Sequence, residues 1–148
     1  MEIILGMMQD TAANALVLRK VAVNLKDSVY EQLLWAIEAL GVEHLWKAKL
    51  SPLQLSYLPT GQRILFRGAD EPKKIKSTKF RKGYCKYIWY EEADEFAGMQ
   101  EIRTINQSLM RGGSSFFVFY SYNPPKSQSN WVRSEEHTSE LQSARATG

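Results

Sequence analysis

The sequence predicts an α/β domain with a largely parallel sheet. Short, fully apolar runs recur along the chain, and runs of this kind are typical of strands that are buried on both faces. Amphipathic segments with helical spacing lie between those runs, so that strands and helices alternate. The 148 residues are enough for one hydrophobic core.

The first part of the chain is predicted to contain a strand between two helices. Residues 2–13 are expected to finish a helix, and residues 15–18 are four apolar residues bounded by polar ones, as in a buried strand. Residues 28–31 have the spacing of a capping box, in which a serine side chain bonds the backbone at the start of a helix. Apolar residues then fall on one helical face until Gly41, which is expected to end the helix.

The middle of the chain is predicted to form a hairpin and then a strand. Residues 53–57 and 63–66 have period-two patterns, and the Pro and Gly of residues 59–62 between them suit a turn. A basic connector, residues 73–82, is expected to be exposed and to lead into the apolar strand 84–90.

A strand–helix–strand unit is predicted to follow. Apolar residues between Met99 and Leu109 recur at helical spacing up to the glycines 112–113, and residues 116–120 form another apolar strand. In open parallel sheets, ligands bind outside the carboxyl ends of the strands. The acidic residues 91–92 and the polar residues 121–123 are expected to lie there.

The composition changes abruptly at Arg133. Residues 133–143 contain one large apolar side chain and no periodicity, and they resemble the in-frame translation of a common sequencing-library adapter. We therefore predict a partial domain over residues 1–132 and a disordered, non-native tail over residues 133–148.

Several functional classes are excluded by composition. No stretch approaches the roughly 20 consecutive apolar residues that a membrane span needs, and the first residues lack the features of an export signal, so we expect a cytoplasmic protein without membrane contact. The single cysteine, Cys85, lies among aromatic residues and is expected to be a buried structural thiol. Two histidines provide no zinc site, and the net charge of +3 is compatible with a nucleic-acid partner without requiring one.

Two adjacent carboxylates, Glu91 and Glu92, directly follow the apolar run of residues 84–90. In nucleotide hydrolysis the first acid of such a pair binds Mg²⁺ on the β- and γ-phosphates of ATP, and the second orients and deprotonates a water. The alternative interpretation is a charged loop before a helix, where acidic residues favour the helix dipole. The position at the end of a buried strand favours the first interpretation.

The sequence lacks the phosphate-binding loop G-x-x-x-x-G-K-[ST] that such ATPases use. Residues 109–115 contain glycine but lack the lysine and the strand-to-helix context. We expect the loop to lie before residue 1 of the intact protein, and this chain alone to be inactive.

Five segments, taken in order, resemble the ATPase domain of phage terminase large subunits of the PBSX-like group. They are residues 13–20 (ANALVLRK), 25–30 (LKDSVY), 66–77 (FRGADEPKKIKS), 88–92 (IWYEE) and 119–125 (FYSYNPP). The resemblance implies an incomplete P-loop NTPase-type (ASCE) sheet with flanking helices and a β-hairpin insertion. It also implies an ATP- and Mg²⁺-dependent motor that moves DNA into procapsids, with a nuclease domain that this chain does not contain.

The resemblance implies roles for particular residues. Glu91 matches the Walker B metal-binding acid, where Asp is commoner, and Glu92 matches the catalytic glutamate. Ser121 and Asn123 match the coupling motif that senses the γ-phosphate. The alternative for Asn123 is a turn residue before two prolines.

Lys76 resembles the basic residue that reaches the phosphates of a neighbouring subunit in related motor rings, with Arg81 and Arg67 as rivals. This basic segment can also be read as a solvated loop or as a contact to the DNA backbone. The implied partners are double-stranded DNA, the portal protein, the terminase small subunit and further copies in a homo-oligomeric ring, all in the cytoplasm of a bacterial host.

Two other functions are compatible with the sequence. Residues 91–94 also resemble the acidic motif of helicases, which favours a helicase-like motor ATPase. The basic connector and the aromatic residues are compatible with a non-catalytic nucleic-acid-binding or assembly module.

Overall fold

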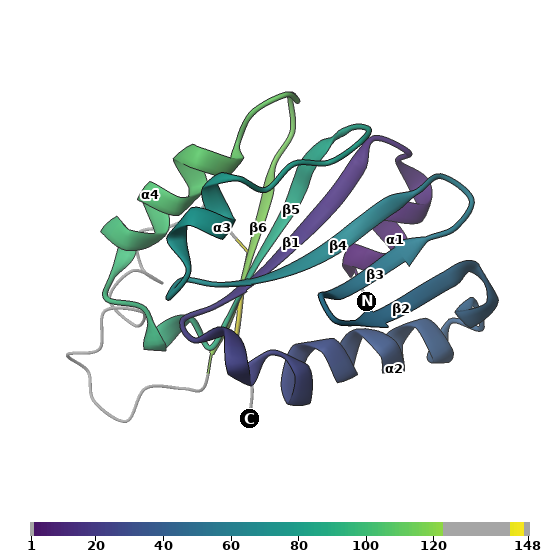
Figure 1. The fold of residues 1–148 in the computed structure, drawn as a ribbon, viewed down its shortest axis with the longest axis horizontal. Helices are drawn as coiled ribbons and strands as arrows, with labels where there is room; N and C mark the ends of the chain where they lie inside the picture. The colour runs from purple at the N-terminus through teal and green to yellow at the C-terminus, as the bar shows by residue number, and fades with distance from the viewer. Residues whose placement is uncertain (1, 123–142, 147–148) are drawn as a thin grey trace.

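A seven-stranded sheet with helices on both faces forms the centre of the computed structural model, which describes residues 2–122 and 143–146 (Figure 1). The strands are β1 (Ala13–Arg19), β2 (Trp46–Leu50), β3 (Leu53–Tyr57), β4 (Gln62–Gly68), β5 (Tyr84–Glu91), β6 (Phe117–Tyr122) and β7 (Ser143–Ala146). The helices are α1 (Glu2–Gln9), α2 (Glu31–Ala39), α3 (Pro72–Lys76) and α4 (Met99–Leu109).

The sheet order is β2-β3-β4-β1-β5-β6-β7, and the strands from β4 to β7 are parallel. This arrangement confirms the predicted α/β class with a largely parallel sheet. The central strands β1 and β5 are almost continuously apolar, because each is covered on both faces. β5 and β6 flank α4, as the predicted strand–helix–strand unit requires.

Two hydrophobic clusters cover the two faces of the sheet, with α1 and α2 on one side and α3 and α4 on the other (Figure 1). Alternate residues of one strand belong to different clusters, since side chains of a strand point to opposite faces. Val17 of β1 packs with α1 and α2, whereas Leu16 and Leu18 pack with α4. β1 and, in the same way, β5 therefore contribute side chains to both hydrophobic clusters.

The predicted hairpin is confirmed and extended. β3 and β4 pair antiparallel with Tyr57 opposite Gln62, and Gly61 adopts a positive φ of 81° in the turn. β2, which the sequence did not indicate, pairs with β3 at the edge of the sheet. Only Trp46 of β2 is buried. An edge strand held by backbone pairing needs few apolar side chains, so its sequence shows no clear alternation.

The predicted capping box is wrong. A π-helical turn, Lys26–Tyr30, precedes α2, and the residue before the helix, Tyr30, makes no side-chain cap. Ser28 Oγ caps no backbone N–H at the start of the helix; it lies within hydrogen-bond distance of the carbonyl oxygens of Asn24 and Leu25 and of the carboxylate of Glu91. The apolar face is where the sequence places it, with Val29, Leu33 and Ile37 buried.

The basic connector is exposed only in part. It contains α3, whose lysines 73, 74 and 76 point outward while Ile75 is buried against the sheet. At 3% exposure, Ile75 anchors the connector between β4 and β5. The predicted exposure therefore applies to the charged side chains and not to the segment as a whole.

The tail predicted to lie outside the fold is only partly described. Ser143–Ala146 forms β7 beside β6, because backbone pairing at a sheet edge does not require apolar side chains. Residues 123–142 and 147–148 lie outside the described residues, and the adapter-like origin of the tail stays a prediction. In the part of the chain that the structure describes, no helix is long and apolar enough to cross a bilayer.

Candidate functional site

The carboxyl ends of three neighbouring parallel strands bring polar residues together. Arg19 ends β1, Glu91 ends β5, and Ser121 lies opposite Glu91 in the pairing of β5 with β6. The sequence placed Glu91 and Ser121 at this edge, and the structure confirms that placement. Asn123 lies outside the described residues, so its predicted position is untested.

Glu91 is a buried carboxylate with two partners. Its side chain points to the face of the sheet covered by α2, where its Oε2 accepts a hydrogen bond from Ser28 Oγ at 3.0 Å. The same oxygen lies 3.5 Å from Nη1 of Arg19. Burial raises the pKa of Glu91 above its ordinary value, and the Ser28 hydrogen bond and the Arg19 charge oppose that rise. The carboxylate is fixed in place, although its charged form is partly desolvated.

Arg19 connects the site to the loop after β5. Its Nε donates to Oε1 of Glu95 at 3.1 Å, and its Nη1 donates to the carbonyl oxygen of Asn24 at 3.3 Å. The guanidinium is therefore shared between Glu91 and Glu95. If Glu91 bound another cation, Arg19 would keep its ion pair with Glu95.

Glu92 has an unusual backbone conformation. Its φ of 52° and ψ of 53° place it in the left-handed region, where it is the only described residue other than glycine with a positive φ. For a residue with a Cβ this region costs roughly 1–2 kcal/mol. Burial raises the pKa of Glu92, and the negative charge of Asp94 adds to the rise. Strain at a strand end next to a buried acid is typical of functional positions.

Ser121 is held by an aromatic neighbour. It is 5% exposed, and its Oγ accepts a hydrogen bond from Nε1 of Trp89 at 2.9 Å. Trp89 belongs to β5, two residues before Glu91, so the indole lies on the same face of the sheet as the acid. The Ser121 hydroxyl is thereby oriented beside the end of β5.

The candidate basic residues do not join this group. Lys76 is exposed at the end of α3, on the opposite face of the sheet, beside a pocket of about 280 Å³ that also includes Glu101 and Thr104. Arg81 precedes β5 and therefore lies at the amino edge, which is the side of the sheet where the parallel strands begin. This position is roughly 25 Å from Glu91 at ~3.3 Å per residue. Neither has a hydrogen bond or ion pair to Glu91 or Glu92 within the described ranges.

Arg67 lies closer in the sheet but faces the other way. It follows Phe66 in β4 and is registered with Leu18 of β1, on the face that carries α3 and α4. Its Nε is buried without a hydrogen-bond partner among the residues described, and burial lowers its pKa. Whether any of the three basic residues acts on a neighbouring subunit stays a prediction.

Sequence reasoning missed Arg19 and Ser28. From the sequence, Arg19 is only the polar residue after the apolar run 15–18, and Ser28 is expected to cap a helix. A basic residue at the carboxyl end of the strand beside the acidic one was the available signal for Arg19. Ser28 had no such signal, because its approach to Glu91 depends on the π-helical turn.

The donor set suits a cation bound mainly through a substrate. Among the residues described, no group of three or more His, Cys, Asp or Glu side chains could coordinate a metal ion. Mg²⁺ at phosphate sites commonly uses one or two carboxylates and takes its other ligands from water and phosphates. One buried carboxylate, Glu91, flanked by the Ser28 hydroxyl fits that pattern.

Cys85 has no part in this site. It is buried at 4% exposure, and burial raises the pKa of its thiol to about 12. The prediction of a buried structural thiol is confirmed.

Comparison with known proteins gives one consistent family. The family model described as phage terminase large subunit matches residues 1–143. The chain is 46% identical over 121 residues to the large terminase subunit of Bacillus phage SPP1, covering 79% of this chain and 29% of that protein. It is 37% identical over 90 residues to the PBSX phage terminase large subunit of Bacillus subtilis (strain 168), covering 60% of this chain and 20% of that one.

A solved structure shares the fold. The large terminase from a thermophilic bacteriophage superimposes with a TM-score of 0.69 at 12% identity, over 97% of this chain and 35% of that chain. The chain thus spans less than a third of the length of the two curated relatives.

Proposed function

This chain belongs to the phage terminase large subunit family, and from that premise we propose that it carries the acidic half of an ATPase site that drives DNA packaging. The observation that carries the proposal is the pair Glu91 and Glu92 at the carboxyl end of β5, with Ser121 beside it on β6. Family membership favours a packaging motor over a helicase or a non-catalytic module.

Glu92 is proposed as the general base that orients and deprotonates the attacking water. Two features support this role. The raised pKa makes its carboxylate a better proton acceptor near neutral pH. Glu92 is also only half-buried, so water can reach it.

Glu91 is proposed as the residue whose carboxylate would hold Mg²⁺. When bound, the ion would supply positive charge to balance the β- and γ-phosphates of ATP. Ser28 orients the carboxylate before any ligand arrives, and the pairing of Arg19 with Glu95 leaves a partner for Arg19 when Glu91 is engaged elsewhere. The residues of this chain thus provide orientation and charge balance.

Ser121 and Asn123 are proposed to sense the γ-phosphate, and the bond from Trp89 supports an oriented Ser121 hydroxyl. Lys76 is proposed to act on the ATP of a neighbouring subunit, which its exposed position permits. For the whole protein we propose double-stranded DNA as substrate and the portal protein, the small subunit and further copies in a ring as partners. We place that assembly in the cytoplasm of the bacterial host.

The proposal is tested by Glu92→Gln in the full-length packaging protein that carries this segment. Loss of a general base is expected to lower ATP turnover roughly 10²–10⁴-fold while nucleotide binding is retained. Glu38→Gln is the matched control, because it makes the same chemical change on the exposed face of α2, away from Glu91 and Arg19, and turnover should stay within a few-fold of wild type. Unchanged hydrolysis in Glu92→Gln would remove the role given to this residue. The 148-residue chain alone, which has no phosphate loop, is expected to hydrolyse no ATP.

A further inference from the structure

The two edges of the parallel sheet carry opposite charge. Described segments that enter the parallel strands (10–12, 58–61, 77–83 and 110–116) contain the basic residues Lys79, Arg81, Lys82 and Arg111. Their one acidic residue is Asp10, which Lys86 neutralises at 2.7 Å. The segments that follow β1, β4 and β5 contain two lysines and six acidic residues, which are Lys20, Lys26, Asp27, Asp70, Glu71, Glu92, Asp94 and Glu95. Acidic residues thus outnumber lysines in the segments at the carboxyl edge, whereas the segments at the amino edge are basic.

A pocket of about 410 Å³ opens at the amino edge, lined by Gln54, Thr60, Gly61, Arg63, Arg81 and Lys82. No acidic side chain lines it. Within the described part of the chain, Arg81 and Lys82 have exposed side chains that make no ion pair. Unpaired cations around a concave surface attract a polyanion, since their charge is not neutralised within the fold.

Arg63 is held in place at this pocket. Its Nη2 donates to the carbonyl oxygen of Lys79 at 2.8 Å, and its guanidinium lies 5.7 Å from the ring centre of Phe80. The Nε and Nη1 atoms of Arg63 have no hydrogen-bond partner among the described residues, which leaves donors for a ligand. Because the guanidinium already covers Phe80, the pocket offers phosphate contacts more readily than an aromatic surface for stacking bases.

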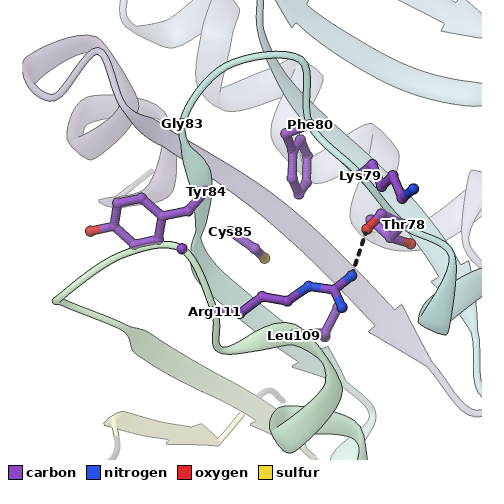
Figure 2. Close-up of a pocket in the computed structure, with 9 residues that line it drawn as sticks. Thr78, Lys79, Phe80, Gly83, Tyr84, Cys85, Leu109 and Arg111 are labelled. Carbon is purple, nitrogen blue, oxygen red and sulfur yellow. Dashed lines mark hydrogen bonds between the residues drawn. The ribbon is translucent and has the colours of Figure 1, made fainter.

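The basic surface continues around the start of β5. Figure 2 shows a second pocket, of about 260 Å³, where Arg111 extends from the loop after α4 and donates to the Thr78 carbonyl oxygen at 3.4 Å. Lys79 comes from the opposite wall of that pocket. Basic side chains from β4, the connector and the loop after α4 therefore converge on one edge.

We propose that this amino edge binds the phosphate backbone of double-stranded DNA without regard to base sequence, with Arg63, Arg81 and Lys82 as the contacting residues. Lysine and arginine at such a surface neutralise phosphates and release counterions. The choice of DNA as the polyanion rests on the proposed packaging function. The length of β5 separates this contact from Glu91 and Glu92, so the DNA contact and the nucleotide chemistry occupy opposite edges of the sheet.

The test compares two charge reversals in the 148-residue chain. Arg81→Glu with Lys82→Glu alters the proposed contact, and Lys47→Glu with Lys49→Glu makes an equal change in net charge on the exposed edge strand β2. The Lys82 carbonyl that accepts from Asn14 belongs to the backbone and survives the substitution. Circular dichroism and the unfolding midpoint verify that both variants fold. Binding of a labelled duplex is followed by fluorescence anisotropy as a function of salt.

The first variant is expected to bind DNA at least tenfold more weakly than wild type, with the slope of log K against log [salt] reduced by roughly 2, about one for each lost phosphate contact. The control should bind within about threefold of wild type. Equal losses in both variants, or no binding by the wild-type chain at low salt, would overturn the proposal. Equal competition by single-stranded DNA would overturn the assignment to a duplex. None of these readouts involves hydrolysis, so they are independent of the Glu92→Gln result.

Discussion

Ser28 acts at the scale of single residues as a support for Glu91 and not as a helix cap. We predict that Ser28→Ala lowers the free energy of unfolding by about 1–3 kcal/mol, because a buried carboxylate loses a hydrogen-bond donor. The decisive measurement is a double-mutant cycle with Glu91→Gln by urea denaturation. A coupling energy of about 1 kcal/mol or more is expected. A coupling energy near zero would mean that Ser28 does not stabilise Glu91.

The raised pKa of Glu91 predicts a pH dependence of stability. Since the folded protein favours the protonated acid, the contribution of Glu91 to stability is present below its ordinary pKa of 4.5 and is lost as the pH rises through the higher folded value. Glu91→Gln should therefore gain stability relative to wild type as the pH rises from about 4.

Unfolding free energies of Glu91→Gln and wild type across this range provide the measurement. Glu38→Gln, on the exposed face of α2, controls for the removal of a carboxylate. The opposite trend, in which wild type gains on the variant with rising pH, would mean that the contacts from Arg19 and Ser28 outweigh burial.

Two site residues could be predicted from the sequence because ligands bind outside the carboxyl ends of parallel strands. Glu91 and Ser121 follow from the carboxyl ends of two apolar strands. Ser28 could not be found, because a turn of non-standard helix decides where its hydroxyl points, and S-x-x-E spacing has a commoner meaning. The strained backbone of Glu92 was equally hidden, since no local residue pattern demands a left-handed glutamate.

At the scale of elements, the start of β5 depends on a close contact with the start of β1. Gly83 has a φ of 75°, and a Cβ there would overlap with the Ala12 carbonyl oxygen, which accepts from the backbone of Tyr84. We predict that Gly83→Ala lowers the free energy of unfolding by about 2–4 kcal/mol, because the backbone itself must move.

Gly61→Ala is the matched control for this prediction. Gly61 has a similar φ of 81°, but nothing lies within 4 Å of its added Cβ. Its cost should be limited to the left-handed conformation, roughly 1–2 kcal/mol. Equal costs in the two variants by urea denaturation would show that the contact with Ala12 adds nothing.

Strands could be predicted where both of their faces are buried, and helices where they bury one stripe of apolar side chains. β1, β5 and β6 are apolar runs, and α4 buries Met99, Ile102 and Leu109 at helical spacing. β2 and α3 were missed because tertiary context creates them: β2 is held by pairing with β3, and α3 buries one side chain, Ile75. Short elements with so little burial leave no periodic signal.

At the scale of the whole molecule, the sharing of β1 and β5 by both hydrophobic clusters predicts a single cooperative unfolding unit. Leu33→Ala on α2 and Ile102→Ala on α4 remove fully buried side chains from opposite faces. Each is expected to lower the free energy of unfolding by about 2–5 kcal/mol. Thr104→Ala, on the exposed side of α4, should change it by no more than about 0.5 kcal/mol.

Tryptophan fluorescence makes this prediction decisive. Trp46 and Trp89 pack with the cluster under α1 and α2, and Trp35 is on α2 itself, so the tryptophans within the described ranges report one face of the sheet. Ile102→Ala alters the other face. If β1 and β5 couple the two faces, Ile102→Ala lowers the urea midpoint measured by fluorescence. The decrease should equal that of the midpoint measured by far-ultraviolet circular dichroism. A fluorescence midpoint that stays at the wild-type value while the dichroism midpoint falls would show that the faces unfold separately.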